Sequence, residues 1–165
     1  MSDPSPRLTG REVHDLAVRI ALSWRALRRG ASRSELRDFL YGTEDGAIEQ
    51  GQMDTLDLLA LRPAWRMSEL AEDLRVDPST ATRAVQRLVN DGLAARRSCS
   101  TDGRVVEVEI SEQGMEVHRV VSERRVELMT HILKRYRSEE LPVLADVLER
   151  FVRAADDFVA SLDSN

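Results

Sequence analysis

The segment Arg75-Val76-Asp77-Pro78 constrains the fold of this chain more than any other. Asp is a preferred N-cap residue and Pro is favoured at the first helical position. The segment therefore predicts a tight turn between a short helix over residues 68–74 and a new helix from Pro78 to Asn90. The inward face of the second helix is apolar and comprises Ala81, Ala84, Val85, Leu88 and Val89.

A β-hairpin is predicted directly after this helix. Asn90-Asp91-Gly92 ends the helix, and two β runs follow over residues 93–97 and 104–110 with a polar connection between them. In the second run apolar residues at 106, 108 and 110 alternate with glutamates, which is the period of a half-buried strand. This order of elements is typical of a winged helix-turn-helix.

The outward face of the helix over residues 78–90 has the chemistry of a recognition helix. Its polar residues are Ser79, Thr80, Thr82, Arg83, Gln86 and Arg87. The first two lie at the helix N-terminus, where hydroxyls and free backbone N–H groups can donate to phosphate. The other four project together towards a groove, where Arg can bind guanine and Gln can bind adenine.

Charge is distributed unevenly along the chain. The formal net charge is −5, yet residues 79–104 hold five arginines against Asp91 and Asp102, a local charge of +3 that leaves −8 elsewhere. Residues 42–57 hold five acids and no base. We expect this acidic stretch to face away from any polyanion, and DNA to meet only the basic face.

Helices are predicted on both sides of this region, so the fold class is mainly α with a small β-hairpin wing. A capping box of Thr9 and Glu12 begins the first helix, and further helices are expected over residues 32–41, 48–61 and 112–135. The last helix follows Ser138, and its apolar residues keep heptad spacing for three heptads. Such a narrow stripe is typical of a coiled-coil contact between subunits, although the same residues can pack on other helices of their own chain.

Residues 67–114 resemble the multiple antibiotic resistance regulator (MarR) family of bacterial transcription factors. The resemblance rests on Ser68-Glu69-Leu70-Ala71, Leu74, the run from Val76 to Arg83, Leu88, Asp91-Gly92-Leu93, Arg96-Arg97, Asp102-Gly103-Arg104 and Ile110-Ser111-Glu112-Gln113-Gly114. Residues 51–61 resemble the preceding helix of the family, and the terminal helices resemble its dimerisation region. Arg75 departs from the pattern, because such turns often have Gly there.

This resemblance implies a ligand-responsive repressor that binds double-stranded DNA as a homodimer at a pseudo-palindromic operator. It divides the chain into a tail (1–8), N-terminal dimerisation helices (9–48), a DNA-binding lobe (49–110) and C-terminal dimerisation helices (111–165). Arg96, Arg97 and Arg104 would serve the wing, with Asp102 holding Arg104. The expected dimerisation residues are Val13, Ala17, Ile20, Leu141, Leu144, Leu148, Phe151 and Phe158.

The resemblance also implies a pocket for a small aromatic or phenolic effector. Candidate lining residues are Trp24, Arg25, Phe39, Tyr41, Met53 and Trp65. The apolar members of this set are equally of the types that fill protein cores. We therefore keep a purely structural role open for each of them.

Other function classes find little support in the sequence. The three histidines lack metal-ligand spacing, and no nucleophile elbow or phosphate-binding glycine loop occurs, so we expect no metal, no cofactor and no enzymatic activity. The lone Cys99 is either an incidental thiol or a redox-sensitive one. No signal peptide or membrane span is recognisable, and we expect a cytoplasmic protein. The alternative function is a winged-helix protein-interaction adaptor that does not bind DNA.

Overall fold

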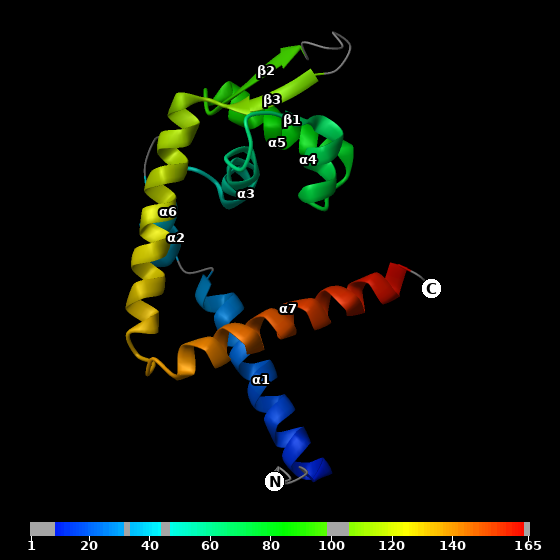
Figure 1. Cartoon of the computed structure of the whole chain (residues 1–165), viewed down its shortest axis with the longest axis vertical. Helices are drawn as coiled ribbons and strands as arrows, with labels where there is room; N and C mark the ends of the chain where they lie inside the picture. Colours follow the sequence, from blue (N-terminus) through cyan, green and yellow to red (C-terminus); the bar gives the residue numbers. More distant parts are fainter. Residues whose placement is uncertain (1–8, 32–33, 44–46, 99–105, 164–165) are drawn as a thin grey trace. The chain divides into compact units, whose positions relative to one another are not determined.

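The computed structural model describes residues 9–31, 34–43, 47–98 and 106–163 (Figure 1). The tail expected over residues 1–8 and the wing residues Cys99, Asp102 and Arg104 lie outside this part. The described elements are α1 (Gly10–Ala31), α2 (Ser34–Tyr41), α3 (Gln50–Leu59), β1 (Trp65–Arg66), α4 (Met67–Asp73), α5 (Pro78–Asn90), β2 (Ala94–Ser98), β3 (Val106–Ile110), α6 (Glu112–Leu133) and α7 (Glu140–Asp163). The predicted fold class, mainly helical with a small β wing, is confirmed.

The chain divides into two compact units, which meet in sequence after Val121 within α6. In the first unit a three-stranded antiparallel sheet has the order β1-β3-β2. The hairpin of β2 and β3 was expected, but β1 was not. A strand of two residues is too short to show an alternating pattern, so nothing in the sequence marked it.

The core of the first unit lies between α3, α4, α5 and the sheet (Figure 1). Its fully buried side chains come from all of these elements and include Met53, Leu56, Leu59, Leu70, Val85, Leu88 and Val108. Burial of each such side chain contributes about 1.5–3 kcal/mol. This shared core fixes α5 against the wing, and the polar face of α5 is left exposed.

The base of the wing is closed by hydrogen bonds between its two ends. Ser111, after β3, donates from its backbone N–H to Leu93 O (3.1 Å) and from its hydroxyl to Gly92 O (2.6 Å). The same hydroxyl oxygen accepts from the N–H of Gly114 (2.9 Å) and thus caps α6, as predicted. A Cβ atom at Gly114 would overlap the carbonyl oxygen of Leu93. Only glycine fits this close approach.

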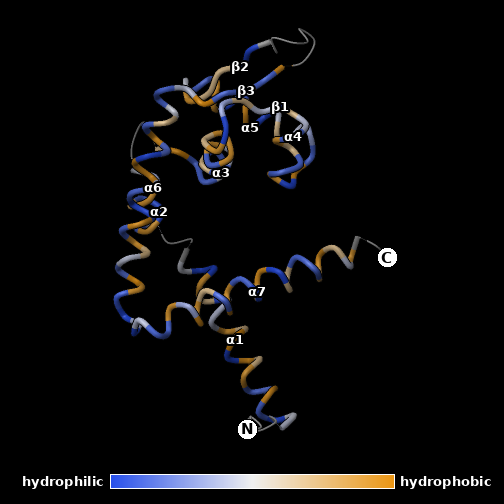
Figure 2. Tube along the Cα trace, in the orientation of Figure 1, coloured by the Kyte–Doolittle hydropathy of each residue, from blue (hydrophilic) through white to orange (hydrophobic). Residues whose placement is uncertain are grey.

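Helices α1 and α7 present apolar side chains to solvent. The predicted capping box begins α1, because the Thr9 N–H donates to Glu12 Oε2 (2.8 Å) and the Glu12 N–H donates to Thr9 Oγ1 (3.4 Å). Large hydrophobic residues recur along each of the two helices, as the orange segments of Figure 2 show. None of the described helices combines the length and the apolar character that crossing a membrane requires.

Candidate nucleic-acid interface

Helix α5 begins at a strongly capped N-terminus. The Asp77 carboxylate accepts from the backbone N–H groups of Ser79 (2.9 Å) and Thr80 (3.0 Å) and from both of their hydroxyls (2.5 and 2.6 Å). The hydroxyl bonds of Ser79 and then Thr80 are the main reason that the pKa of Asp77 lies well below its ordinary value. The Asp77 cap and Pro78 at the start of α5 are confirmed.

This cap changes what Ser79 and Thr80 present outward. We expected their hydroxyls to donate to phosphate, but both hydroxyl protons are directed to Asp77. Thr82 is similar, because its hydroxyl donates to the Pro78 carbonyl oxygen (2.7 Å). The hydroxyl oxygens of all three side chains can therefore act outward only as hydrogen-bond acceptors.

The turn before α5 keeps its geometry without a glycine. Arg75 has a φ of 54°, in the left-handed region that favours glycine. Its N–H donates to Glu72 O (2.9 Å) and the Val76 N–H donates to Ala71 O (3.1 Å), the two bonds of a Schellman motif that ends α4. Backbone hydrogen bonds thus hold the turn between α4 and α5, although Arg75 stands where such turns often have glycine.

The four groove-facing residues of α5 are all exposed, and two of them are bound to neighbouring elements. Arg87 Nη1 lies 3.2 Å from Glu49 Oε2. Gln86 accepts from Arg96 of β2 (2.9 Å) and donates to Asn90 (2.8 Å). Arg83 makes no hydrogen bond or ion pair with any residue in the described ranges, so its guanidinium is available to a ligand.

The two described wing arginines lie in different surroundings. Arg97 contacts two glutamates of β3, with its Nε 3.5 Å from Glu107 and its Nη1 3.1 Å from Glu109. Arg96 contacts the neutral Gln86 instead. Successive side chains of a strand point to opposite faces, which explains the difference. Of these two, Arg96 faces α5, whereas the positive charge of Arg97 is already balanced within the wing.

The outer face of α5 borders a cavity of about 370 Å³ whose far wall is α3. Arg83 and Arg87 line it together with Glu49 and Asp54. Two acids of the stretch over residues 42–57, which we expect to face away from any polyanion, thus lie beside the basic residues of α5. They come close because α3 packs against α5 through the core, a contact that the charge pattern along the chain does not reveal.

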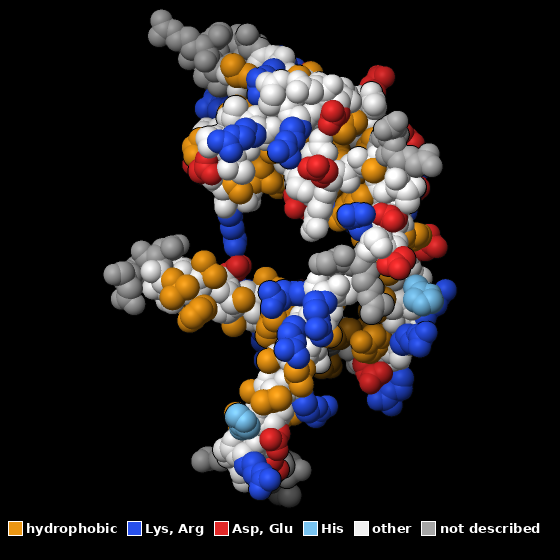
Figure 3. Space-filling model, turned by 180° about the vertical axis from the view of Figure 1, so that it is seen from behind, with side chains coloured by type: hydrophobic (Ala, Val, Ile, Leu, Met, Phe, Trp, Pro, Cys, Tyr) orange, Lys and Arg blue, Asp and Glu red, His pale blue; other side chains and the backbone are white. Residues whose placement is uncertain are grey.

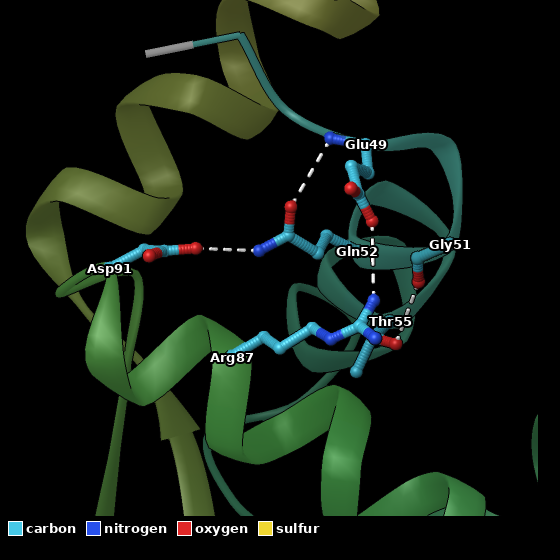
Figure 4. A network of polar contacts seen from close by, with 6 residues as sticks. All are labelled: Glu49, Gly51, Gln52, Thr55, Arg87 and Asp91. Carbon is cyan, nitrogen blue, oxygen red and sulfur yellow. Dashed lines mark hydrogen bonds and ion pairs between the residues drawn. The ribbon is translucent and has the colours of Figure 1, made fainter. Parts of the chain in front are cut away.

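A polar network that the sequence reading missed holds α3 to the end of α5 (Figure 4). The largely buried Gln52 donates from Nε2 to Asp91 Oδ2 (2.6 Å), and its Oε1 accepts from the Glu49 N–H (3.2 Å). Together with the Glu49–Arg87 ion pair, these bonds link the start of α3 to the end of α5. The spacing of Glu49 and Gln52 is that of a capping box, which was the available signal.

The effector candidates do not form one group. Met53 and Trp65 are 0% and 4% exposed and belong to the core of the first unit. Tyr41 is half-buried and packs against the same core. Trp24 and Phe39 remain exposed, and Arg25 is exposed on α1. The burial of Met53 and Trp65 is thus explained by a structural role in the core.

The expected dimerisation residues lie on α1 and α7. Val13, Ala17 and Ile20 are exposed on α1, and Leu148, Phe151 and Phe158 are exposed on α7. Leu141 and Leu144 are half-buried near the start of α7. Figure 3 shows hydrophobic side chains gathered along α7.

Comparison with known proteins shows which family this chain is similar to. The MarR family model matches residues 48–106. The HTH-type transcriptional regulator YdgJ of Bacillus subtilis is 28% identical over 103 residues, 62% of this chain and 63% of YdgJ, so the chain spans less than two thirds of that relative. The HTH-type transcriptional repressor MdtR of the same organism is 26% identical over 119 residues, 72% of this chain and 77% of MdtR.

The fold agrees with that comparison. The crystal structure of Streptococcus pneumoniae FabT in complex with DNA matches with a TM-score of 0.77 at 22% identity and covers 86% of this chain and 99% of FabT. The helix-turn-helix, the three-stranded wing and the flanking helices account for this likeness of fold. From the matched family model and the named relatives, we conclude that residues 48–106 form a segment of the MarR family type.

Proposed function

We propose that this protein is a dimeric transcriptional repressor that inserts α5 into the major groove of a pseudo-palindromic operator. The observation that carries this proposal is the exposed polar face of α5. Beside a β wing, this face combines the amide of Gln86 with Arg83, which has no ion-pair partner among the described residues. Arg can bind guanine with two hydrogen bonds and Gln can bind adenine in the same way. The relative MdtR is named a repressor, and FabT was crystallised with DNA, which supports the direction of the proposal.

The proposed homodimer follows from the exposed apolar faces of α1 and α7. Each helix carries several exposed large apolar side chains, and exposed apolar patches mark interaction sites. A two-fold dimer presents two copies of α5, and its symmetry requires an operator of two inverted half-sites. Phosphate contacts from Arg87, Arg97 and the wing residue Arg104 would complete each half-site.

For the effector, we propose contacts from Trp24, Arg25, Phe39 and Tyr41. These four retain exposed surface, whereas Met53 and Trp65 are used by the core. An aromatic carboxylate would stack on the rings and pair with the guanidinium of Arg25. Benzoate is a suitable probe, and DNA affinity with and without it measures the response.

The test of DNA binding is selection of bound fragments from the source genome by the full chain, followed by affinity measurement on the enriched duplex. Arg83→Ala should weaken binding by about 5- to 150-fold, equivalent to about 1–3 kcal/mol, and relax the base preference at one position. Arg153→Ala is the matched control, because it removes the same charge from α7. Enrichment of no sequence by the wild-type protein would exclude a specific DNA-binding role and favour the protein-interaction adaptor.

A further inference from the structure

A chain of two hydrogen bonds joins the wing to the recognition helix. Arg96 Nη1 donates to Gln86 Oε1 (2.9 Å), and Gln86 Nε2 donates to Asn90 Oδ1 (2.8 Å). Arg96 lies opposite Val108 in the β2–β3 register, and Val108 is fully buried. Paired residues share one face of a sheet, so the side chain of Arg96 leaves the wing on the side that packs against α5.

This contact determines which end of the Gln86 amide points in which direction. A guanidinium has five donors and no acceptor. If the amide were rotated by a half-turn, its NH₂ group would meet the donors of Arg96, and one hydrogen bond would be replaced by a repulsive contact. Asn90 cannot impose the orientation in the same way, because its own amide can rotate to offer either a donor or an acceptor.

Among the described residues, the oriented amide has one acceptor site and one donor without a partner. Gln86 Oε1 uses one of its two lone pairs to accept from Arg96, and Nε2 uses one of its two hydrogens to donate to Asn90. The second lone pair and the second hydrogen remain. The major-groove edge of adenine offers a donor at N6 and an acceptor at N7, which matches this pair. The edge of guanine offers two acceptors, O6 and N7, and one of them would face the Gln86 oxygen.

We propose that Arg96 is a positioning residue that holds the Gln86 amide in the orientation that selects adenine over guanine at one base pair of each half-site. This inference rests on the proposed DNA-binding function. Arg96 acts through Gln86, and its charge is not what determines the preference. The same geometry makes the wing strand β2 part of the base readout of α5.

The experiment measures the affinity of the full chain for operator duplexes that differ at the base pair where Gln86→Ala relaxes the preference. The wild-type protein should prefer adenine over guanine there by about 5- to 150-fold. Arg96→Met, which keeps a long side chain without a donor, should reduce this ratio to the value of Gln86→Ala. Arg96→Lys, which restores a donor towards Oε1, should recover most of the ratio.

Arg153→Met is the control, because it removes the same charge from α7, where Arg153 pairs with Glu149 and not with Gln86. It should leave the adenine-to-guanine ratio unchanged. In the Gln86→Ala background, Arg96→Met should cause no further change in that ratio. Circular dichroism melting curves establish that each variant folds.

Three results would overturn the inference. If Arg96→Met weakens binding to all duplexes equally and lowers the salt slope by about 0.9, Arg96 is a phosphate contact only. If Gln86→Ala relaxes no position while the wild-type protein still selects a sequence, Gln86 reads no base, and the proposed function stands without this inference. If the wild-type protein selects no sequence, both fail together.

Discussion

Arg87 and Glu49 form an ion pair across the α3–α5 contact, with Arg87 Nη1 3.2 Å from Glu49 Oε2. Both side chains are exposed, and such pairs contribute at most about 1 kcal/mol to stability. The pair therefore matters less for the fold than for the charge that α5 presents. A phosphate that binds Arg87 must replace a carboxylate, and Glu49 remains nearby to repel it.

Glu49→Gln should therefore raise the affinity for DNA of random sequence and make its salt dependence steeper. Freed from its partner, Arg87 can neutralise one phosphate and add up to about 0.9 to the slope of log affinity against log salt. Fluorescence anisotropy at several salt concentrations measures this slope. Glu35→Gln on α2 is the control of equal charge, and an identical slope in the two variants would contradict the prediction.

Asp77→Ala should destabilise the protein at neutral pH, because four hydrogen bonds at the start of α5 are lost. We expect the Tm to fall by about 2–4 °C. The pKa of Asp77 is lower in the folded than in the unfolded chain, so its stabilising effect is present above the ordinary value of 3.8 and is lost as the pH falls below it.

The difference in Tm between the wild-type protein and Asp77→Ala should accordingly shrink in acid. Thermal unfolding followed by circular dichroism at neutral pH and at progressively lower pH measures it. Asp73→Ala, a neighbouring substitution at the end of α4, provides the comparison. A difference that stays constant down to the lowest pH would mean that the cap does not depend on the carboxylate charge.

Gly114→Ala should lower the free energy of unfolding by roughly 1–3 kcal/mol, because the added methyl group overlaps the Leu93 carbonyl oxygen and forces α6 away from the wing base. Gly51→Ala in α3 is the matched control, since a Cβ there meets nothing within 4 Å. Chemical denaturation of both variants tests this contrast. Equal stability of the two would show that α6 can shift without cost.

Leu148→Glu should dissociate the proposed homodimer. Leu148 lies on α7 with 53% of its surface exposed, and a carboxylate buried there on association would lack a partner. Light scattering coupled to gel filtration should show the mass halved from that of the wild-type protein. Glu149→Lys, which changes the next residue of α7, should leave the mass at the dimer value.

The local signals in the sequence were sufficient to predict α5 and its surroundings. Asp77 and Pro78 define the start of the helix through their backbone preferences, and the helix ends at Asn90 as expected. These effects act between residues that are close in the chain. The same holds for the Thr9–Glu12 capping box of α1 and for Ser111 at the start of α6.

Contacts between distant residues could not be predicted in this way. The strand β1 exists because Trp65 pairs with Val108, and neither residue marks the other in the sequence. The ion pair of Glu49 with Arg87 was not predicted, because charges were counted along the chain rather than across the α3–α5 contact. Which of two adjacent arginines faces α5 likewise depends on the strand register.

The closed base of the wing has a consequence for how this protein can diverge. Ser111 binds Gly92 and Leu93, so the two strands are joined at their root independently of the segment that connects their far ends. The entropy of closing a loop grows only with the logarithm of its length, about 0.6 kcal/mol for each doubling. Insertions between Ser98 and Val106 should thus be tolerated while the strand pairing stays unchanged. The reach of the wing along a duplex can then vary separately from the base preference of α5.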